Sequence, residues 1–271
     1  MQAEDRTLAG RAAELLRTAR RELAQALYPP LCWLCGRRAL DGYGCDEHAL
    51  EGAFFRPHEA RCEGCLERLP AGLVAGLCAG CRRAPRGYRR LVALGEYRLD
   101  SSLRAWILAL KHGGRKELAA PLAAALAQRW RASGLCAPGA RLVPVPLHPW
   151  RVLERGHDQA LELARALAFQ VELELLPALR RVRWTAPQGS PGARARESNV
   201  AGAFRLRRAQ AAALAGQEVW LVDDVVTSGA TVRACATLVR AAGAREVSVL
   251  ALARVPRVGE DESGSATLRG P

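Results

Sequence analysis

The stretch VWLVDDVVTSGATV, residues 219–232, decides the fold of this chain. It opens with an apolar run of strand length that ends in two adjacent carboxylates, Asp223 and Asp224. Burying a charge is costly unless the charge is paired or faces a ligand, so two carboxylates at a strand end indicate a site. The small or hydroxyl-bearing residues of the turn that follows are Thr227, Ser228, Gly229, Ala230 and Thr231.

Strand-like and helix-like segments alternate on both sides of this stretch. The strand-like segments lie at 90–97, 141–148, 218–225 and 245–255, and the helix-like segments at 101–110, 117–130, 158–170 and 228–244. This alternation predicts an α/β fold with a parallel, doubly wound sheet. Ligands of such sheets bind beyond the carboxyl ends of the strands, where Asp223 and Asp224 are expected.

The turn at 227–231 has the chemistry of a phosphate cradle. Backbone amides, hydroxyls and the dipole of the following helix all favour an anion there, and Gly229 permits a close backbone approach. The two carboxylates would accept hydrogen bonds from the 2- and 3-hydroxyls of a ribose 5-phosphate. The alternative is a solvent-facing strand end with a Thr or Ser that caps the helix.

Eight cysteine and histidine residues occur in pairs with two-residue gaps. They are Cys32, Cys35, Cys45, His48, Cys62, Cys65, Cys78 and Cys81. Two such pairs complete one tetrahedral zinc shell, so eight ligands predict two closed, structural zinc sites. Sequential pairing closes the shorter loops and costs the least entropy, but a cross-braced arrangement stays open. A lone surface histidine is the alternative interpretation of His48.

The chain divides by pattern into four parts. Residues 1–28 read as a basic amphipathic N-terminal helix, 29–87 as a small cysteine-rich zinc-binding module, 88–256 as the α/β domain and 257–271 as a disordered tail. The helix would dock on its own protein, on a membrane surface or on DNA.

Charge and hydropathy limit the partners. Lys and Arg number 40 against 27 Asp and Glu, a net charge of +13 that favours nucleic acids, phosphate-rich metabolites or an anionic membrane surface. A solvated, arginine-rich surface is the alternative. No apolar run reaches the ~18 residues of a transmembrane segment, and no signal peptide is visible, so a cytoplasmic location is expected.

The string at 219–232 resembles the PRPP-binding signature of type I phosphoribosyltransferases, and the chain as a whole resembles the ComF (ComFC) competence-protein family. The matching segments are LKHGGRKELA, VPVPLHPWRVLERGHDQ, RVRWTAPQ, RARESNVAGAF and VWLVDDVVTSGATV, which with the cysteine pairs span about 29–255. The resemblance implies a zinc finger ahead of a phosphoribosyltransferase-like domain that binds PRPP with Mg²⁺.

The same resemblance assigns two further elements. A pyrophosphate loop would use the charges and free amides of Arg151, Arg155 and Gly156. His157 and Asp158 stand where the family usually has an aromatic residue and Asn, and Asp158 weakens an anion loop unless it caps the next helix. A hood over the ligand is expected at 180–204, a basic, aperiodic stretch. Its family-typical positions are Thr185, Gln188, Arg196 and Asn199.

The KHGG break offers a further cation. Lys111 would lie near the phosphates, or it belongs to a helix end with a glycine cap.

Three functions are compatible with these features. The resemblance to ComF implies an accessory protein of natural transformation that handles single-stranded DNA, works with DNA-uptake machinery and lies peripherally at the inner membrane. An active phosphoribosyltransferase in nucleotide salvage and a PRPP-sensing regulator are the alternatives, so enzyme activity stays open. Fold alone does not decide among them.

Overall fold

The structure, a computed structural model, describes residues 30–39, 43–56, 59–70, 72–84, 86–184, 200 and 202–256. The helix expected over 1–28 and the tail at 257–271 therefore lie outside the described residues. The chain divides into two units, Met1–Leu50 and Glu51–Pro271, so the two cysteine clusters belong to different units. The module boundary expected at residue 87 stays a prediction.

In the first unit the described regular structure is a bridge between Leu31 and Arg38 and a short 3₁₀ helix, η1 (Asp46–His48). The second unit carries the α/β fold. Its helices are η2 (Glu51–Ala53), α2 (Ala79–Arg83), α3 (Ser102–His112), η3 (Lys116–Leu118), α4 (Ala119–Ala132), α5 (Pro149–Arg155), α6 (Gln159–Val171), α8 (Arg208–Ala211), η4 (Ala212–Leu214) and α9 (Ala230–Ala241). Its strands are β1 (Leu91–Glu96), β2 (Arg141–Pro144), β3 (Glu174–Leu175), β4 (Leu179–Arg181), β5 (Phe204–Leu206), β6 (Glu218–Val226) and β7 (Glu246–Arg254).

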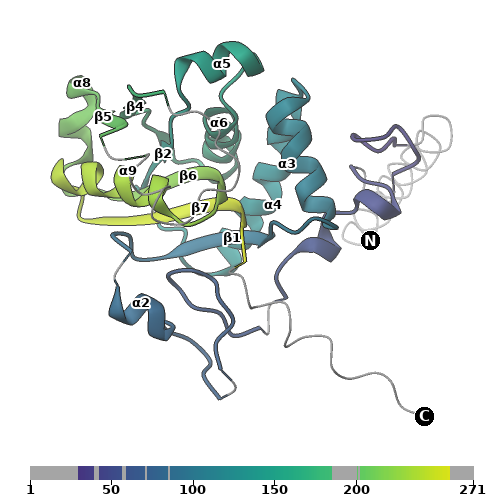
Figure 1. Ribbon diagram of the computed structural model, residues 1–271, viewed down its shortest axis with the longest axis horizontal. Coiled ribbons are helices and arrows are strands. Elements are labelled where there is room, and N and C mark those ends of the chain that lie inside the picture. Colours follow the sequence, from purple (N-terminus) through teal and green to yellow (C-terminus); the bar gives the residue numbers. More distant parts are fainter. Residues whose placement is uncertain are drawn as a thin grey trace, which may run out of the picture. The chain divides into compact units, whose positions relative to one another are not determined.

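The main sheet has five parallel strands in the order β1-β7-β6-β2-β3, which confirms the predicted parallel α/β class. The stretch at 219–232 forms most of the central strand β6 and the start of α9. Helix α9 covers one face of the sheet, and α4 and α6 lie on the other (Figure 1).

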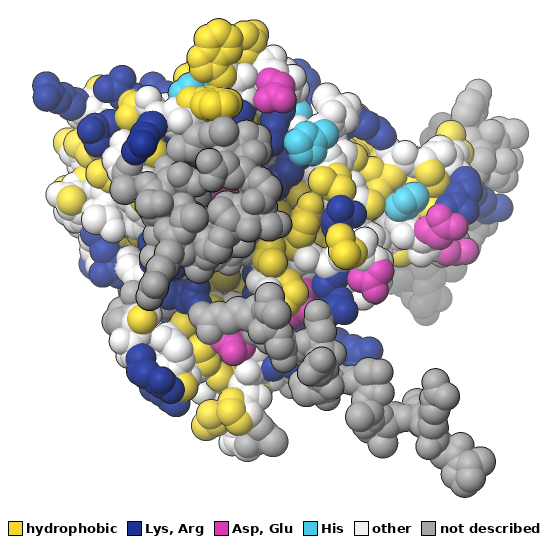
Figure 2. All heavy atoms as spheres, viewed as in Figure 1, with side chains coloured by type: hydrophobic (Ala, Val, Ile, Leu, Met, Phe, Trp, Pro, Cys, Tyr) yellow, Lys and Arg dark blue, Asp and Glu magenta, His cyan; other side chains and the backbone are white. Residues whose placement is uncertain are grey.

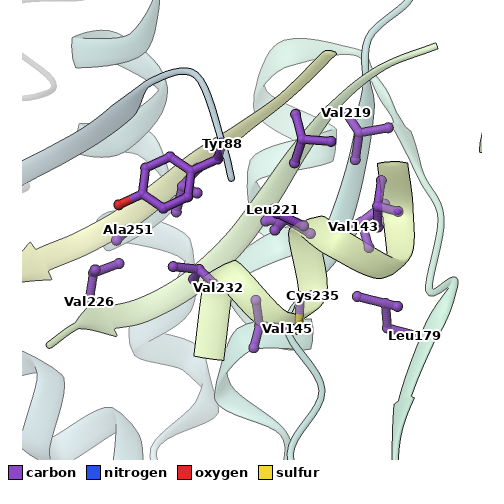
Figure 3. Packing of buried hydrophobic residues seen from close by; sticks show 14 of the residues in the cluster. Tyr88, Val143, Val145, Leu179, Val219, Leu221, Val226, Val232, Cys235 and Ala251 are labelled. Atoms are coloured by element: carbon purple, nitrogen blue, oxygen red, sulfur yellow. The ribbon is translucent and has the colours of Figure 1, made fainter. Parts of the chain in front are cut away.

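Alternation along β6 builds both halves of the core. On the face toward α9, Val219 and Leu221 pack with Val232 and Cys235, all fully or nearly fully buried (Figure 3). On the opposite face Trp220 packs on Trp130 of α4, with ring centroids 4.9 Å apart. Successive side chains of a strand point to opposite faces, so both faces of β6 are covered and its residues from Val219 to Val222 are all apolar.

The loop expected between 148 and 158 is largely helical. Helix α5 begins with Pro149 at its first turn, and His148 accepts a hydrogen bond from the amide of Trp150 at 3.3 Å. Gly156, with φ 78°, ends the helix in the left-handed conformation. Proline at the start and glycine after the end are the normal termini of a helix, so the sequence contained this signal.

Two further differences concern strand ends. Strand β2 stops at Pro144 rather than continuing to 148, although the Val145 amide still donates to the Val222 carbonyl at 2.9 Å. Strands β4 and β5, at the two ends of the stretch expected to form the hood, pair antiparallel in a small second sheet. Two paired three-residue strands so far apart in sequence give no periodic signal.

The segment before β1 is tied to the sheet. The Phe55 amide donates to the Leu94 carbonyl at 2.7 Å, and Leu91 donates to the Glu63 carbonyl at 2.8 Å. Gly95 is needed here, because a Cβ on it would lie 2.1 Å from the Ala53 carbonyl oxygen. The Cys62–Cys81 region is therefore fixed to the edge strand of the α/β domain.

Candidate functional site

The candidate site lies at the carboxyl ends of β2 and β6, which are neighbours in the sheet. The chain leaves β2 into α5 and α6, which packs on one face, and leaves β6 into α9, which packs on the other. Crossovers that diverge from adjacent strands open a crevice between the strand ends, which is where open α/β sheets bind ligands.

Asp224 lies on the α6 face of β6 and is engaged by protein groups. Its side chain is 6% exposed, and its Oδ2 lies 2.8 Å from Lys111 Nζ and accepts a hydrogen bond from Gln159 at 3.3 Å. Its Oδ1 accepts from the Val225 amide at 2.8 Å. Lys111, in the last turn of α3, is thus the counter-ion of Asp224, and the role of this carboxylate toward a ribose stays a prediction.

Asp223 lies on the α9 face and is only partly buried. Its Oδ1 accepts from the amide of Asp224 at 2.9 Å. Burial and the neighbouring Asp224 charge raise the pKa of Asp223 well above its ordinary value. Asp223 is therefore the carboxylate of the pair that is available to a hydroxyl or a cation in the crevice.

The turn after β6 presents its backbone to the same crevice. Gly229 has φ 78° and forms the N-cap of α9, where no side chain caps the helix. The Ser228 hydroxyl accepts weakly from the Ala230 amide at 3.4 Å. Among the described residues, the amides of Ser228 and Gly229 donate to no other backbone group. Thr227 is exposed and Thr231 partly buried, so the turn offers amides and hydroxyls to an anion.

The residues expected to bind pyrophosphate belong to α5 and its C-terminal turn. Arg151 and Arg155 are one helical turn apart, and burial together with the Arg155 charge lowers the pKa of Arg151. Gly156 follows them in the left-handed conformation. These two guanidiniums make this rim of the crevice positive.

Asp158 is a helix cap rather than an obstacle to an anion. Its Oδ1 accepts from the amides of Ala160 and Leu161 at 3.1 Å each, and its Oδ2 accepts from Leu147 at 3.0 Å. Burial raises the pKa of Asp158 despite these donors.

His157, the other departure from the family pattern, is buried. Its Nε2 lies 2.7 Å from the Leu110 carbonyl and its Nδ1 lies 3.1 Å from the Arg155 carbonyl. It therefore links the loop to α3. The contact of Gln159 with Asp224 was also not foreseen, although Gln159 ends the quoted family segment.

The expected hood is described only at its base. Arg181 is the last residue of β4 and interacts electrostatically with Arg151 and Asp223. Burial and the Arg151 charge lower the pKa of Arg181. Arg196, Thr185, Gln188 and Asn199 lie outside the described residues, so their roles stay predictions. A cavity of about 620 Å³ separates α5 from this base, and its lining includes Leu153, Asp158, Arg180, Arg181 and Arg207.

The first cysteine cluster brings together Cys32, Cys35, Cys45 and His48. The Cys35 and Cys45 sulfurs are 3.6 Å apart, and Cys45 Sγ lies 3.3 Å from His48 Nδ1. The Arg37 guanidinium donates to Cys35 at 3.5 Å and lowers the pKa of that thiol to about 6. His48 thus lies in ligand position.

The second cluster brings together Cys62, Cys65, Cys78 and Cys81. The sulfurs of Cys65 and Cys78 are 3.7 Å apart, and the hydrogen bond from Cys65 lowers the pKa of Cys62 to about 4. The Arg86 Nε donates to Cys81 Sγ at 3.0 Å.

Both clusters have the dimensions of a tetrahedral site. In each, all four ligand atoms lie within 4.8 Å of one another. Zn–S bonds of about 2.3 Å place tetrahedral sulfurs about 3.8 Å apart, close to the separations seen here. The grouping is the sequential one, and each cluster could hold one metal ion with no open position for a substrate.

The sheet, the crevice and the turn after β6 define a phosphoribosyltransferase-like domain, and the phosphoribosyl transferase domain family matches residues 152–267. The DNA utilization protein YhgH of Salmonella typhi is 36% identical over 232 residues, covering 83% of this chain and 97% of that protein. YhgH of Escherichia coli K12 is 34% identical over 235 residues, covering the same shares of each.

A more distant relative is competence protein F of Haemophilus influenzae, 28% identical over 214 residues, covering 71% of this chain and 90% of that protein. The chain belongs to the ComF family, as its motifs indicated. The glutamine PRPP amidotransferase of B. subtilis shows a likeness of TM-score 0.36 at 19% identity, over 54% of this chain and 30% of that one.

Within the described residues, every helix is too short or too polar to cross a bilayer.

Proposed function

We propose that this protein binds PRPP or another ribose phosphate in the β2–β6 crevice and assists the handling of single-stranded DNA. The observation that carries the proposal is the juxtaposition of the free turn at 227–231 with Asp223 at one strand end. Family members bear the names DNA utilization protein and competence protein, which supports the DNA-related role.

The chemistry of the crevice fits a phosphorylated pentose. The amides at the N-terminus of α9 would hold a phosphate, and Asp223 would accept from a ribose hydroxyl or bind Mg²⁺ that accompanies the ligand. Lys111 is neutralised by Asp224, so its role here is to position that carboxylate rather than to contact phosphate. Arg151 and Arg155 would face the diphosphate.

The surface beside the crevice suits a nucleic acid strand. On α5, Trp150 is 66% exposed and Leu153 is 74% exposed. Figure 2 shows hydrophobic side chains over α5 with Lys and Arg side chains nearby. Arg180 and Arg207 line the adjoining cavity. Exposed aromatic rings stack on bases and arginines neutralise phosphates, so a single strand could pass here without sequence preference.

The metal clusters have a structural role in this proposal. Zn²⁺ in each would crosslink segments that contain few large apolar residues, and metal binding would supply part of their folding free energy. A cytoplasmic location with peripheral association at the inner membrane, and contact with DNA-uptake proteins, remain part of the proposal.

Calorimetry tests it directly. PRPP with Mg²⁺ is titrated into the zinc-loaded protein, and the complex is then challenged with an unlabelled oligothymidylate strand. Binding of PRPP and of the strand, the latter weakening steeply with salt, is expected. Absence of PRPP binding would reject the ribose phosphate site, and salt-insensitive or absent DNA binding would reject the DNA role. Release of pyrophosphate with an added base would instead favour an active transferase.

A further inference from the structure

Arg86 connects the second cysteine cluster to the phosphate turn. Its Nε donates to Cys81 Sγ at 3.0 Å. The other end of its guanidinium reaches the turn, because a Cβ built on Gly229 would lie 3.5 Å from Arg86 Nη1. One side chain thus touches a metal-ligand sulfur and lies beside the N-cap of α9.

The surroundings of that guanidinium are rich in donors. The Tyr88 hydroxyl would lie 3.8 Å and Arg233 Nη1 3.3 Å from the same Cβ position on Gly229. Among the described residues no carboxylate forms an ion pair with Arg86, and the hydrogen-bond acceptor of its Nε is the Cys81 sulfur. Arg233 Nη1 already donates to the Ser228 carbonyl at 2.8 Å. The terminal nitrogens of Arg86, the Tyr88 hydroxyl and the amides of Ser228 and Gly229 form a set of donors that an anion would complete.

The support for Arg86 is rigid. The Tyr88 side chain is buried, with 5% of its surface exposed, and this burial raises the pKa of its hydroxyl. Figure 3 shows its ring over the sheet with the hydroxyl on the side of Val226, the last residue of β6. The next residues are held by the sheet, since Arg89 donates to the Val247 carbonyl at 2.7 Å and Val249 donates to the Arg90 carbonyl at 2.8 Å.

The geometry divides the donors of Arg86 between two partners. A guanidinium has five N–H donors in a fixed plane, so a bond from Nε to sulfur leaves the terminal nitrogens for a second acceptor. Four thiolates around one Zn²⁺ leave two net negative charges, which attract and orient Nε. The cluster would thus aim the terminal nitrogens at the turn.

We propose that Arg86 binds the phosphate monoester held by the 227–231 turn and couples its binding to metal loading of the Cys62–Cys81 cluster. The cluster is then part of the ligand site and not only a structural support. Coupling is reciprocal, so bound phosphate also slows loss of the metal. This inference rests on the proposed ribose phosphate site.

A purely structural role for Arg86 makes a different prediction. If Arg86 only neutralises the thiolates, its replacement would speed metal loss and leave phosphate affinity unchanged once zinc is loaded. Arg83→Gln is the matched control, since Arg83 is an exposed arginine of the same segment whose side chain forms no hydrogen bond or ion pair among the described residues.

The first measurement is calorimetry with ribose 5-phosphate on zinc-loaded protein. Arg86→Gln is expected to weaken binding about tenfold, the loss of one charge-assisted hydrogen bond, and Arg83→Gln is expected to leave it unchanged. Arg86→Lys keeps the positive charge but loses the planar set of guanidinium donors, so its affinity for ribose 5-phosphate is expected to lie between those of Arg86→Gln and Arg83→Gln. Ribose without phosphate and an oligothymidylate strand form separate arms. A monoester site is supported only if Arg86→Gln lowers the affinity for ribose 5-phosphate more than it lowers the affinity for the DNA strand.

The second measurement follows zinc release to a chelator in a Cys35→Ser background, where the remaining metal sits in the second cluster. Ribose 5-phosphate is expected to slow release about fivefold with Arg86 present and not at all in Arg86→Gln. Equal binding by wild type and Arg86→Gln would overturn this inference alone. Failure of wild type to bind ribose 5-phosphate would reject the proposed function, and the inference with it.

Discussion

On the α6 face of β6, Asp224 is 6% exposed and paired with Lys111, whereas on the α9 face Asp223 has no cation within salt-bridge distance among the described residues. The two carboxylates are adjacent in sequence, yet strand geometry sends them to opposite sides of the sheet. The α6 face uses its charge to hold α3, α6 and β6 together. The α9 face leaves its charge, its turn and Arg86 for a ligand. The four predictions below test this division.

The largest effect is expected on the α6 face. Lys111→Met removes the counter-ion and leaves the Asp224 carboxylate buried and unpaired, which costs about 3–5 kcal/mol of unfolding free energy. Urea denaturation measures it. The double variant Lys111→Met with Asp224→Asn removes both charges and is expected to recover much of the loss. If Lys111→Met lowers the unfolding free energy by less than about 1 kcal/mol, the Lys111–Asp224 ion pair does not hold the α6 face together.

On the α9 face, Gly229→Ala introduces a Cβ at φ 78°, 3.3 Å from Arg233 Nη1. Backbone strain costs about 1–2 kcal/mol, and the crowded turn should also lose ribose 5-phosphate binding. Gly216→Ala is the control, because Gly216 has φ 70° and open space around it. Similar stability losses with binding lost only in Gly229→Ala would support the division. Unchanged binding in Gly229→Ala would refute it.

Asp223→Asn is expected to stabilise the protein. Since the folded-state pKa of Asp223 is raised, its proton is held more tightly in the folded state. Its contribution to stability is complete below the unfolded pKa of about 3.9 and is lost as pH rises through the folded value. The Asn variant should therefore gain stability over wild type with rising pH, on the order of 1 kcal/mol near neutrality, while ribose 5-phosphate binding weakens.

Urea denaturation of both proteins across that pH range gives the sign of the stability difference between Asp223→Asn and wild type. A variant that is less stable than wild type at neutral pH would place Asp223 with Asp224 as a structural residue.

The smallest effect is expected for Asp158→Asn, which restores the usual family residue. Asn caps helices as well as Asp, and loss of a buried charge offsets loss of the contact with Leu147, so unfolding free energy should change by less than about 0.5 kcal/mol. Ribose 5-phosphate binding should be unchanged. A tenfold change in affinity would make Asp158 part of the ligand site.

Much of the fold could be read from the sequence because burial on both faces makes strands such as β6 continuous apolar runs. Helix α5 was missed although Pro149 and Gly156 mark its ends. The β4–β5 pair was missed because short strands joined across a long stretch carry no local signal. The eight metal-ligand candidates were predicted from their two-residue gaps, and sequential pairing was the simplest grouping because it closes the shorter loops. The sequence left a cross-braced arrangement open, and the structure shows the sequential grouping.

The candidate site was only partly predictable. The turn at 227–231 is a local motif, so its residues were identified directly. The engagement of Asp224 by Lys111, more than a hundred residues away, depends on how α3 packs against the sheet. Arg86 gave no sequence signal, because one arginine among many acquires meaning only from its neighbours.

By itself the sequence determined the family and the parallel α/β class, and it predicted a phosphate site at 227–231 and two sets of metal ligands. These features depend on residues close together in the chain. Only the tertiary structure decided which carboxylate is neutralised, which lies open to the crevice, and that Arg86 joins a cysteine cluster to the turn. Such contacts join residues distant in the chain, and their partners follow from packing and strand direction rather than from local spacing.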